Sequence, residues 1–196
     1  MPRPVLTFSV AALLTLAACS GGSGFGGAGR IDYTRIDTAY SRADFAYAGS
    51  GRDMATDILG NPFPGVTQAA FDNAVTTAMH GAHFGPPTNF TTTPGESARP
   101  AYRVRLLWNG PASANGNALC TDDPIQGGGS EPGGTARLIA AFCNSGDAST
   151  YVVGSVDGVS GPDDPRFIGF VRQVTLKLFP PRDGQFDPDR CFWPDC

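Results

Sequence analysis

The chain has 196 residues, a length typical of one domain rather than several. Acidic side chains outnumber basic ones, with 18 Asp and Glu against 14 Lys and Arg, and the formal net charge is −4 at pH 7. Proteins that hold nucleic acid or an anionic lipid surface by charge carry basic patches. This mildly acidic composition therefore argues against both classes of partner.

The first residues have the pattern of a signal peptide. Arg3 supplies a positive charge, and residues 5–18 are uncharged and mostly apolar. This run is too short to cross a bilayer core of about 30 Å as a helix. It is therefore predicted to be a cleaved export signal over residues 1–18 rather than a membrane anchor.

The end of that segment, Leu16-Ala17-Ala18-Cys19, resembles the lipobox of bacterial lipoprotein precursors. The resemblance implies cleavage just before Cys19 and lipid (diacylglycerol and usually a further acyl chain such as palmitate) on this cysteine. More than one acyl chain gives stable anchoring. Ser20 resembles the residue that sorts such proteins to the outer membrane. The alternative is an ordinary secretory signal with a cysteine near its cut site by chance.

The residues that follow form a predicted tether. The stretch from Ser20 to Gly29 is glycine-rich and uncharged, so we expect it to be a flexible coil with a span of about 18 Å. Together with the lipidated cysteine it makes a tether over residues 19–30. Residues 31–196 are then expected to form one domain. For this domain the sequence shows no family resemblance.

Periodicity predicts the elements of the domain in chain order. Residues 43–49 and 52–60 are the weaker strand candidates. A helix is expected between an N-cap at Thr67 and a stop at Gly81, because apolar residues recur from Phe71 with helical spacing. Three strands are expected over residues 101–109, 136–144 and 149–156, the last two joined by a turn at 145–147.

A second helix is expected from an N-cap at Asp164, with Pro165 at its first position, to the pair Pro180-Pro181. Its apolar arc is wider than one sheet face needs, because three residues lie outside the main stripe: Ile168, Leu176 and Phe179. Either aromatic residues of the C-terminal tail cover that flank (Phe186, Phe192 and Trp193), or the flank binds a partner. The element order predicts an α+β two-layer sandwich, with a mostly antiparallel sheet and two helices on one face.

Four cysteines remain in the predicted domain, and an even number in an exported chain indicates two disulfides. Cys191 and Cys196 are close enough to close a small loop, which leaves Cys120 to pair with Cys143. Three connectivities are nevertheless open. No histidine lies near these cysteines, so disulfides are favoured over a metal site, and no metal or other cofactor is predicted.

The histidines, His80 and His83, offer little for catalysis. The first lies on the far side of the predicted helix from its apolar stripe, and the second follows the stop at Gly81. Their spacing does not match a pair of metal ligands on one helix face. A hydrolase that combines one of them with Asp53 is the least favoured hypothesis.

Arginines gather on and beside the strand over residues 101–109. Tyr102, Val104, Leu106 and Trp108 alternate with Arg103 and Arg105, and Arg99 lies in the loop before them. Arginine can bind carboxylate or phosphate groups with two hydrogen bonds, although a solvated sheet face is the simpler interpretation.

Three functions follow from these observations. The favoured one is a lipid-anchored, periplasm-facing envelope lipoprotein, non-enzymatic, that binds or supports another envelope protein. The alternative is a small-molecule or glycan-binding domain that uses Arg99, Arg103 and Arg105. A hydrolase comes last.

Overall fold

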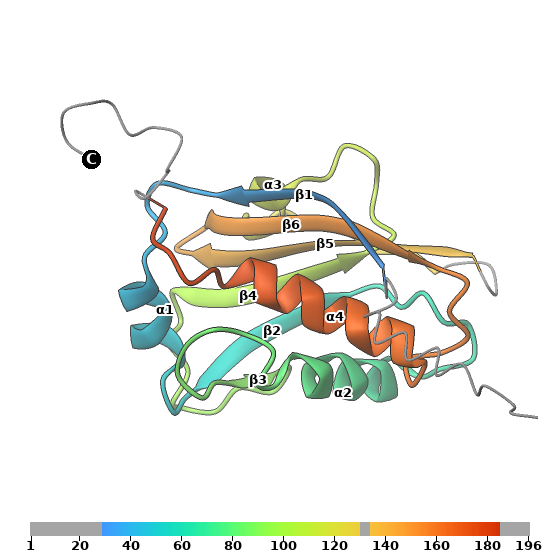
Figure 1. The fold of residues 1–196 in the computed structure, drawn as a ribbon, viewed down its shortest axis with the longest axis horizontal. Helices are drawn as coiled ribbons and strands as arrows, with labels where there is room; N and C mark the ends of the chain where they lie inside the picture. The colour runs from blue at the N-terminus through green and yellow to red at the C-terminus, as the bar shows by residue number, and fades with distance from the viewer. Residues whose placement is uncertain (1–28, 130–133, 185–196) are drawn as a thin grey trace, which may run out of the picture.

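The computed structural model describes residues 29–129 and 134–184, which form a mixed α/β domain around one six-stranded sheet (Figure 1). The sheet order is β1-β6-β5-β4-β2-β3. The strands are β1 (Arg30–Ile36), β2 (Asp53–Leu59), β3 (Asn89–Thr91), β4 (Tyr102–Trp108), β5 (Thr135–Asn144) and β6 (Asp147–Asp157). The helices are α1 (Arg42–Gly49), α2 (Gln68–Met79), α3 (Gly116–Cys120) and α4 (Pro165–Leu178).

The sheet is mostly antiparallel, as predicted. β1 pairs with β6, β6 with β5, and β5 with β4, all antiparallel. β5 and β6 form the predicted hairpin, whose turn at Ser145 and Gly146 has positive φ angles of 53° and 95°. The remaining pairings, of β2 with β4 and of β2 with β3, are parallel.

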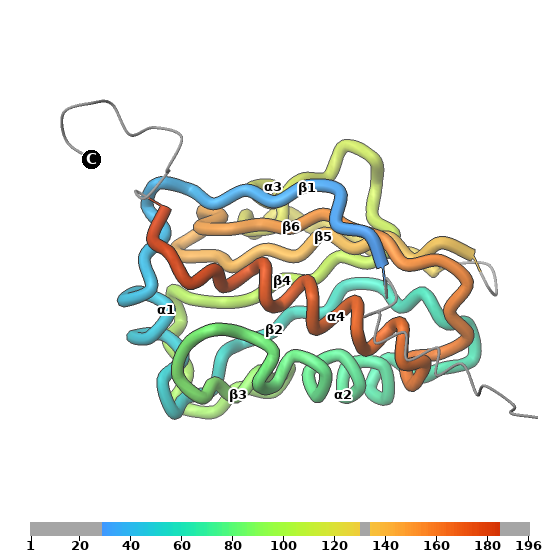
Figure 2. The backbone as a smooth tube through the Cα atoms, in the orientation of Figure 1, coloured from blue at the N-terminus to red at the C-terminus, as the bar shows by residue number. Residues whose placement is uncertain are grey.

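The two predicted helices form where their capping signals lie. The side chain of Thr67 accepts a hydrogen bond from the Ala70 amide at the start of α2, and Gly81 follows its end with a φ of +66°. Asp164 caps α4 in the same way and accepts from the Arg166 amide. α2 and α4 lie side by side (Figure 2). Both contribute buried side chains to the larger core cluster.

The wide apolar arc of α4 belongs mostly to this core. Phe179 is fully buried against Phe45, Phe90 and Phe142, and Ile168 packs on the same cluster. Leu176 remains 37% exposed. The tail aromatics predicted to cover the flank lie outside the described residues.

The helix count differs from the prediction, since the described residues contain four helices rather than two. Residues 43–49, predicted as a strand, belong to α1. Ser41 caps this helix, its hydroxyl accepting from the Asp44 amide, and Phe45, Ala48 and Gly49 are buried at helical spacing. Three elements were not predicted: β1, β3 and α3.

α3 covers part of the opposite sheet face, where a smaller core forms. Leu107 of β4 and Leu119 of α3 are fully buried there, with Ile139 and Ala141 of β5. Gly116 lies against the ring of Tyr151, because a Cβ at this position would fall 2.1 Å from Tyr151 Cγ. The sheet is therefore covered by α2 and α4 on one face and by α3, in part, on the other.

Candidate functional site

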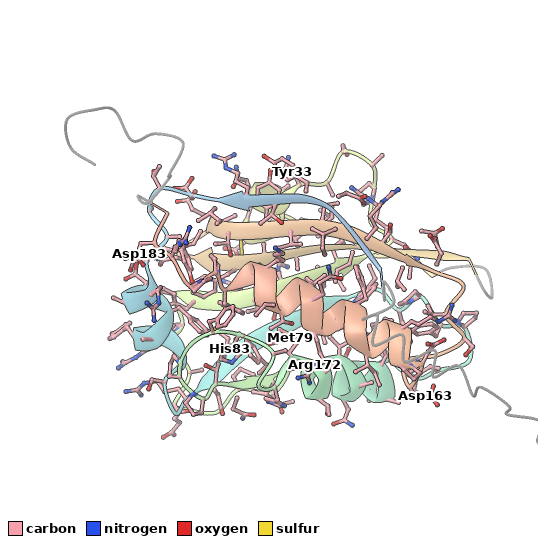
Figure 3. All side chains as sticks on the ribbon, viewed as in Figure 1. Tyr33, Met79, His83, Asp163, Arg172 and Asp183 are labelled. Carbon is pink, nitrogen blue, oxygen red and sulfur yellow. A yellow bond between two sulfur atoms is a disulfide. The ribbon has the colours of Figure 1, made fainter. Side chains whose placement is uncertain are left out.

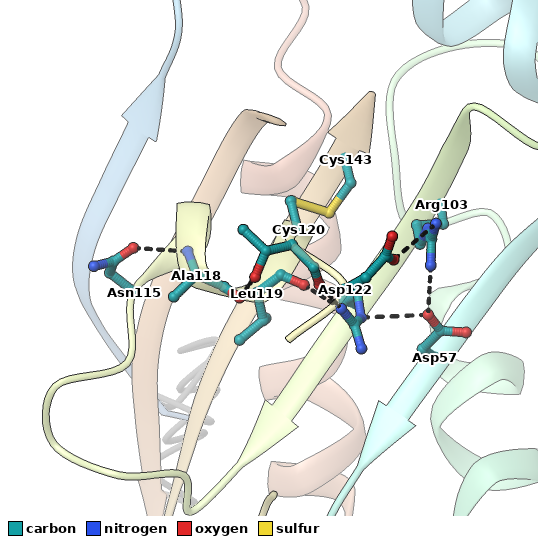
Figure 4. The surroundings of a disulfide bond; sticks show 10 residues. Asp57, Arg103, Asn115, Ala118, Leu119, Cys120, Asp122 and Cys143 are labelled. Carbon is teal, nitrogen blue, oxygen red and sulfur yellow. Dashed lines mark hydrogen bonds and ion pairs between the residues drawn. A yellow bond between two sulfur atoms is a disulfide. The ribbon is translucent and has the colours of Figure 1, made fainter. Parts of the chain in front are cut away.

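The arginines of β4 lie on the sheet face that α3 partly covers. As predicted, Tyr102, Val104, Leu106 and Trp108 contribute to the core under α2 and α4, so the intervening Arg103 and Arg105 point to the other face. The end of α3 and the residues after it lie against these arginines (Figure 4). The two arginines of this face therefore contact other parts of the domain and do not form a free surface.

Arg105 is committed to internal partners. Its Nη1 donates to the carbonyl oxygens of Leu119, at 2.6 Å, and Thr121, at 2.7 Å. Its Nε lies 3.3 Å from Asp57 Oδ2, and its side chain is only 13% exposed. These carbonyls are at the C-terminal end of α3, where helix carbonyls lack partners within the helix. Arg105 thus fastens α3 to the sheet.

Arg103 is the more accessible of the two, with a side chain 36% exposed. Its guanidinium lies 3.9 Å from Asp57 Oδ2 and 3.8 Å from Asp122 Oδ1. The cluster therefore pairs two arginines with two carboxylates. An anionic ligand would have to compete with both aspartates for Arg103.

Asp57 was not linked to the arginines from the sequence, although it is the carboxylate that lies near both of them. The parallel pairing of β2 with β4 places it directly beside Arg105. Spacing along the chain carries no signal for this register. Asp122 lies after α3, which was itself not predicted.

Arg99 does not join this cluster. Its guanidinium carbon lies 4.6 Å above the centre of the Tyr47 ring, in the geometry of a cation–π contact. Tyr47 belongs to α1 and contacts Tyr102, whose side chain packs toward the opposite face from Arg103. The three predicted arginines therefore do not converge on one site.

The disulfide between Cys120 and Cys143 is present, with a Cα–Cα distance of 5.4 Å, and this pair belongs to one of the three connectivities that the sequence left open. It joins the last residue of α3 to β5, close to the carbonyls that Arg105 holds (Figure 4). The other predicted pair, Cys191 and Cys196, lies outside the described residues. Among residues 29–129 and 134–184 no group of three metal-binding side chains occurs.

A chain of hydrogen bonds links Asp53 to His80, though not in a catalytic geometry. His80 Nε2 lies 3.1 Å from Asn89 Oδ1, and Asn89 Nδ2 donates to Asp53 Oδ1 at 2.7 Å. The other Asp53 oxygen accepts from the Gly95 amide at 2.8 Å. The Gly95 and Asn89 hydrogen bonds lower the pKa of Asp53, which makes it a poor general base. This series of hydrogen bonds connects β2, β3 and the end of α2.

His83, which is labelled in Figure 3, is half-buried. Its ring contacts those of Phe45, Phe90 and Phe179, and its Nδ1 is buried without a hydrogen-bond partner among the described residues. Burial lowers the pKa of His83, and the charge of His80 lowers it further, against a hydrogen bond with the Phe84 backbone that raises it. His83 is therefore a packing residue that favours its neutral form.

This burial predicts a loss of stability in mild acid. The unfolded chain takes up a proton on His83 near pH 6.5, whereas the folded chain resists it until a lower pH. The free energy of unfolding should thus be unaffected by His83 above that range and fall as the pH drops below it. Urea unfolding at several pH values measures this slope, which His83→Leu should reduce and the control His80→Gln should largely keep. An unchanged slope in His83→Leu would contradict the prediction.

Comparison with known proteins gives little to add. No protein-family model matches the chain, and neither does any curated protein. No described helix is long and apolar enough to cross a membrane. Among solved structures, the chain is similar to a PelC dodecamer from Paraburkholderia phytofirmans, with a TM-score of 0.38 and 7% sequence identity over 76% of this chain and 93% of that one. A likeness at this level carries no conclusion about fold or function.

Proposed function

We propose that this chain is a bacterial envelope lipoprotein that binds another envelope protein. In this proposal Cys19 carries the lipid, and the tether, expected over residues 19–30, ends before Arg30, which is the first residue of β1. The domain faces the periplasm, and the outer membrane is favoured over the inner membrane as the site of the anchor. The match of Leu16-Ala17-Ala18-Cys19 to a lipobox supports the anchor. The glycine-rich segment after it supports a domain held clear of the lipid headgroups.

The observation that carries the binding role is the position of β1. It is the first described strand after the proposed tether, and it forms an edge of the sheet, with β6 on one side and no other described strand on the other. An edge strand presents unpaired backbone donors and acceptors to a partner strand. Tyr33 and Ile36 are large apolar side chains on this strand and are 51% and 41% exposed. Figure 3 shows Tyr33 on β1.

The rest of the domain serves as a rigid carrier in this proposal. Its body is the two-layer arrangement of the sheet with α2 and α4, and α3 is a small addition on the second face. The disulfide and Arg105 fix that addition. Adaptors need a stable frame for an exposed strand, and this arrangement supplies one.

The two other hypotheses have less support. A ligand site on the arginines would rely on Arg103, because the guanidinium of Arg105 is occupied by Leu119, Thr121 and Asp57. A hydrolase would rely on Asp53, whose carboxylate is held by Asn89 and Gly95 and whose pKa is lowered. Binding at the β1 edge, by contrast, does not require a side chain that is already held by internal hydrogen bonds.

The proposal is tested by purifying the tagged full-length protein from membranes in mild detergent and identifying its partners by mass spectrometry. A partner should be captured with the wild type and lost with the double variant Tyr33→Ser and Ile36→Ser. The matched control is Phe84→Ser, which removes an aromatic side chain that is 53% exposed outside β1 and should keep the partner. Retention of the partner by the β1 variant would refute the edge as the binding site.

The anchor is tested separately with Cys19→Ser. Mass spectrometry of the N-terminal peptide should find a diacylglyceryl group on Cys19 in the wild type. The Cys19→Ser protein should leave the membrane fraction. An unmodified Cys19 in a membrane-bound wild type would refute the anchor without bearing on the edge strand.

A further inference from the structure

The two faces of β1 can be assigned from its pairing with β6. Arg30, Tyr33 and Arg35 pair with Ser155, Val153 and Tyr151, so they point to the α3 side of the sheet. Ile31, Thr34 and Ile36 pair with Gly154, Val152 and Thr150, and they point to the α4 side. The register shifts between Ile31 and Tyr33, which leaves Asp32 as an extra residue in a bulge.

We infer that the outer edge of β1 pairs with β1 of a second copy of this chain, antiparallel, about a two-fold axis at Thr34. The pairing places Thr34 opposite Thr34 and Tyr33 opposite Arg35. Because each bulge absorbs one residue, Ile36 then lies opposite Ile31, and Asp37, the residue after β1, lies opposite Arg30. Every pair is made of residues that point to the same side of the sheet.

The chemistry of these pairs is complementary. Arg30 and Asp37 carry opposite charges, and opposite charges directly across two strands are stabilising. Arg35 opposite Tyr33 allows a cation–π contact with a ring that is 51% exposed. Ile36, which is 41% exposed, gains an apolar neighbour in Ile31. Each pair except the central one occurs twice by symmetry.

Neighbouring registers fail on the same criteria. When each bulge again absorbs Asp32, an axis at Tyr33 places Arg35 opposite Arg30, and like charges directly across two strands are destabilising. An axis at Arg35 places two arginines directly opposite each other, which is destabilising. Of these axes, the one at Thr34 pairs residues that point to the same side of the sheet and places no like charges opposite each other.

Charged residues and bulges on an edge strand usually prevent such pairing. In β1 these charges already have ion-pair partners within the chain, Arg30 with Asp32 and Arg35 with Asp37. In the dimer, Arg30 of one copy and Asp37 of the other add a pair across the two strands. One pair of strands buries a modest area, so the contact is weak between molecules in dilute solution. This inference rests on the proposed function, since a lipid anchor would hold copies in one membrane and raise their effective concentration.

The first test is cross-linking of the full chain in envelope membranes. Thr34→Cys places two thiols across the axis, within the Cα–Cα range of a disulfide, and most of this protein should migrate as a disulfide-linked dimer after mild oxidation. Ile36→Cys is the matched control on the same strand and face. Its two copies would lie about 14 Å apart across the pair and should remain monomeric. Equal cross-linking of the two variants would overturn the register.

The second test introduces charges at the axis. Two differently tagged copies are co-expressed, and one is purified through its tag in mild detergent. Thr34→Lys with itself, or Thr34→Glu with itself, should lose the co-purification seen for the wild type, because like charges meet at the axis. Thr34→Lys with Thr34→Glu should restore it. Thr34 is exposed, so neither variant is expected to unfold the domain.

The outcomes separate this inference from the proposed function. If wild-type copies neither cross-link through Thr34→Cys nor co-purify, the second copy is not the partner. If a different protein is still captured and is lost with Tyr33→Ser and Ile36→Ser, the adaptor role stands without the dimer. If the mixed Lys and Glu pair fails to restore an association that each single charge abolishes, the two-fold axis is wrong.

Discussion

Trp108→Ala is expected to lower the free energy of unfolding by about 3–5 kcal/mol, the usual cost of removing a buried large aromatic side chain. Trp108 is fully buried at the end of β4, and its ring contacts those of Phe71, Phe167 and Phe170. It therefore joins the sheet to both α2 and α4. Urea unfolding followed by circular dichroism measures the change.

Trp108→Phe is the matched variant for this position. The indole Nε1 is buried without a hydrogen-bond partner among the described residues. Losing it removes an unpaired polar group, which offsets part of the lost packing. The loss should therefore stay below about 1.5 kcal/mol. A loss as large as that of Trp108→Ala would show that the indole nitrogen makes a bond of consequence.

Replacing Cys120 and Cys143 together by Ala is expected to cost about 2–4 kcal/mol, since the disulfide closes a loop with a sequence separation of 23. Arg105 holds the carbonyls on either side of Cys120. With the disulfide gone, those hydrogen bonds still fasten the end of α3. The double cysteine variant should therefore fold and keep Leu119 buried.

Removing Arg105 as well should release that end of α3. The combined loss in Arg105→Ala on the cysteine-free background is expected to exceed the sum of the separate losses by roughly 0.5–3 kcal/mol, because each fastening compensates for the other. A double-mutant cycle of urea unfolding measures this coupling. Arg103→Ala is the control: its ion pairs are long and its side chain is 36% exposed, so it should cost under about 1 kcal/mol. If the losses from Arg105→Ala and from removing the disulfide simply add, Arg105 and the disulfide hold α3 independently of each other.

The parts of the fold that were predictable depend on local signals. α2 and α4 each carry a capping residue, a periodic apolar stripe and a terminating Gly or Pro within one stretch of sequence. β4 alternates apolar residues with Arg103 and Arg105, β5 is a mostly apolar run, and the turn between β5 and β6 contains a glycine with positive φ. The even number of cysteines predicted disulfides but left their connectivity open, and the structure pairs Cys120 with Cys143.

α1 was assigned wrongly because its signal is short. Phe45 and Tyr47 alternate as in a strand, whereas the buried positions Phe45, Ala48 and Gly49 follow a helix. The hydroxyl of Ser41 favours the helix because it caps the first turn. In a segment of seven residues, the positions expected for a strand and those expected for a helix overlap, so the two patterns are hard to tell apart.

The arginine cluster depended on contacts that are distant in sequence. Arg103 and Arg105 were placed on the correct face, but their partners come from the parallel pairing with β2 and from α3. A chain read alone gives no register for a parallel pair. The loop position of Arg99, near β4 in sequence, likewise did not indicate its contact with Tyr47 of α1.

The antiparallel pairing of β1 with β6 also has a mechanical consequence. If the tether enters at Arg30 and the membrane anchor pulls along β1, the force is spread over the whole ladder from Arg30 to Ile36. All of these backbone hydrogen bonds must then shear together. A pull at a right angle to the strand would instead open them one at a time from Arg30, so the direction of tension on the anchor would determine how readily the first strand is lost.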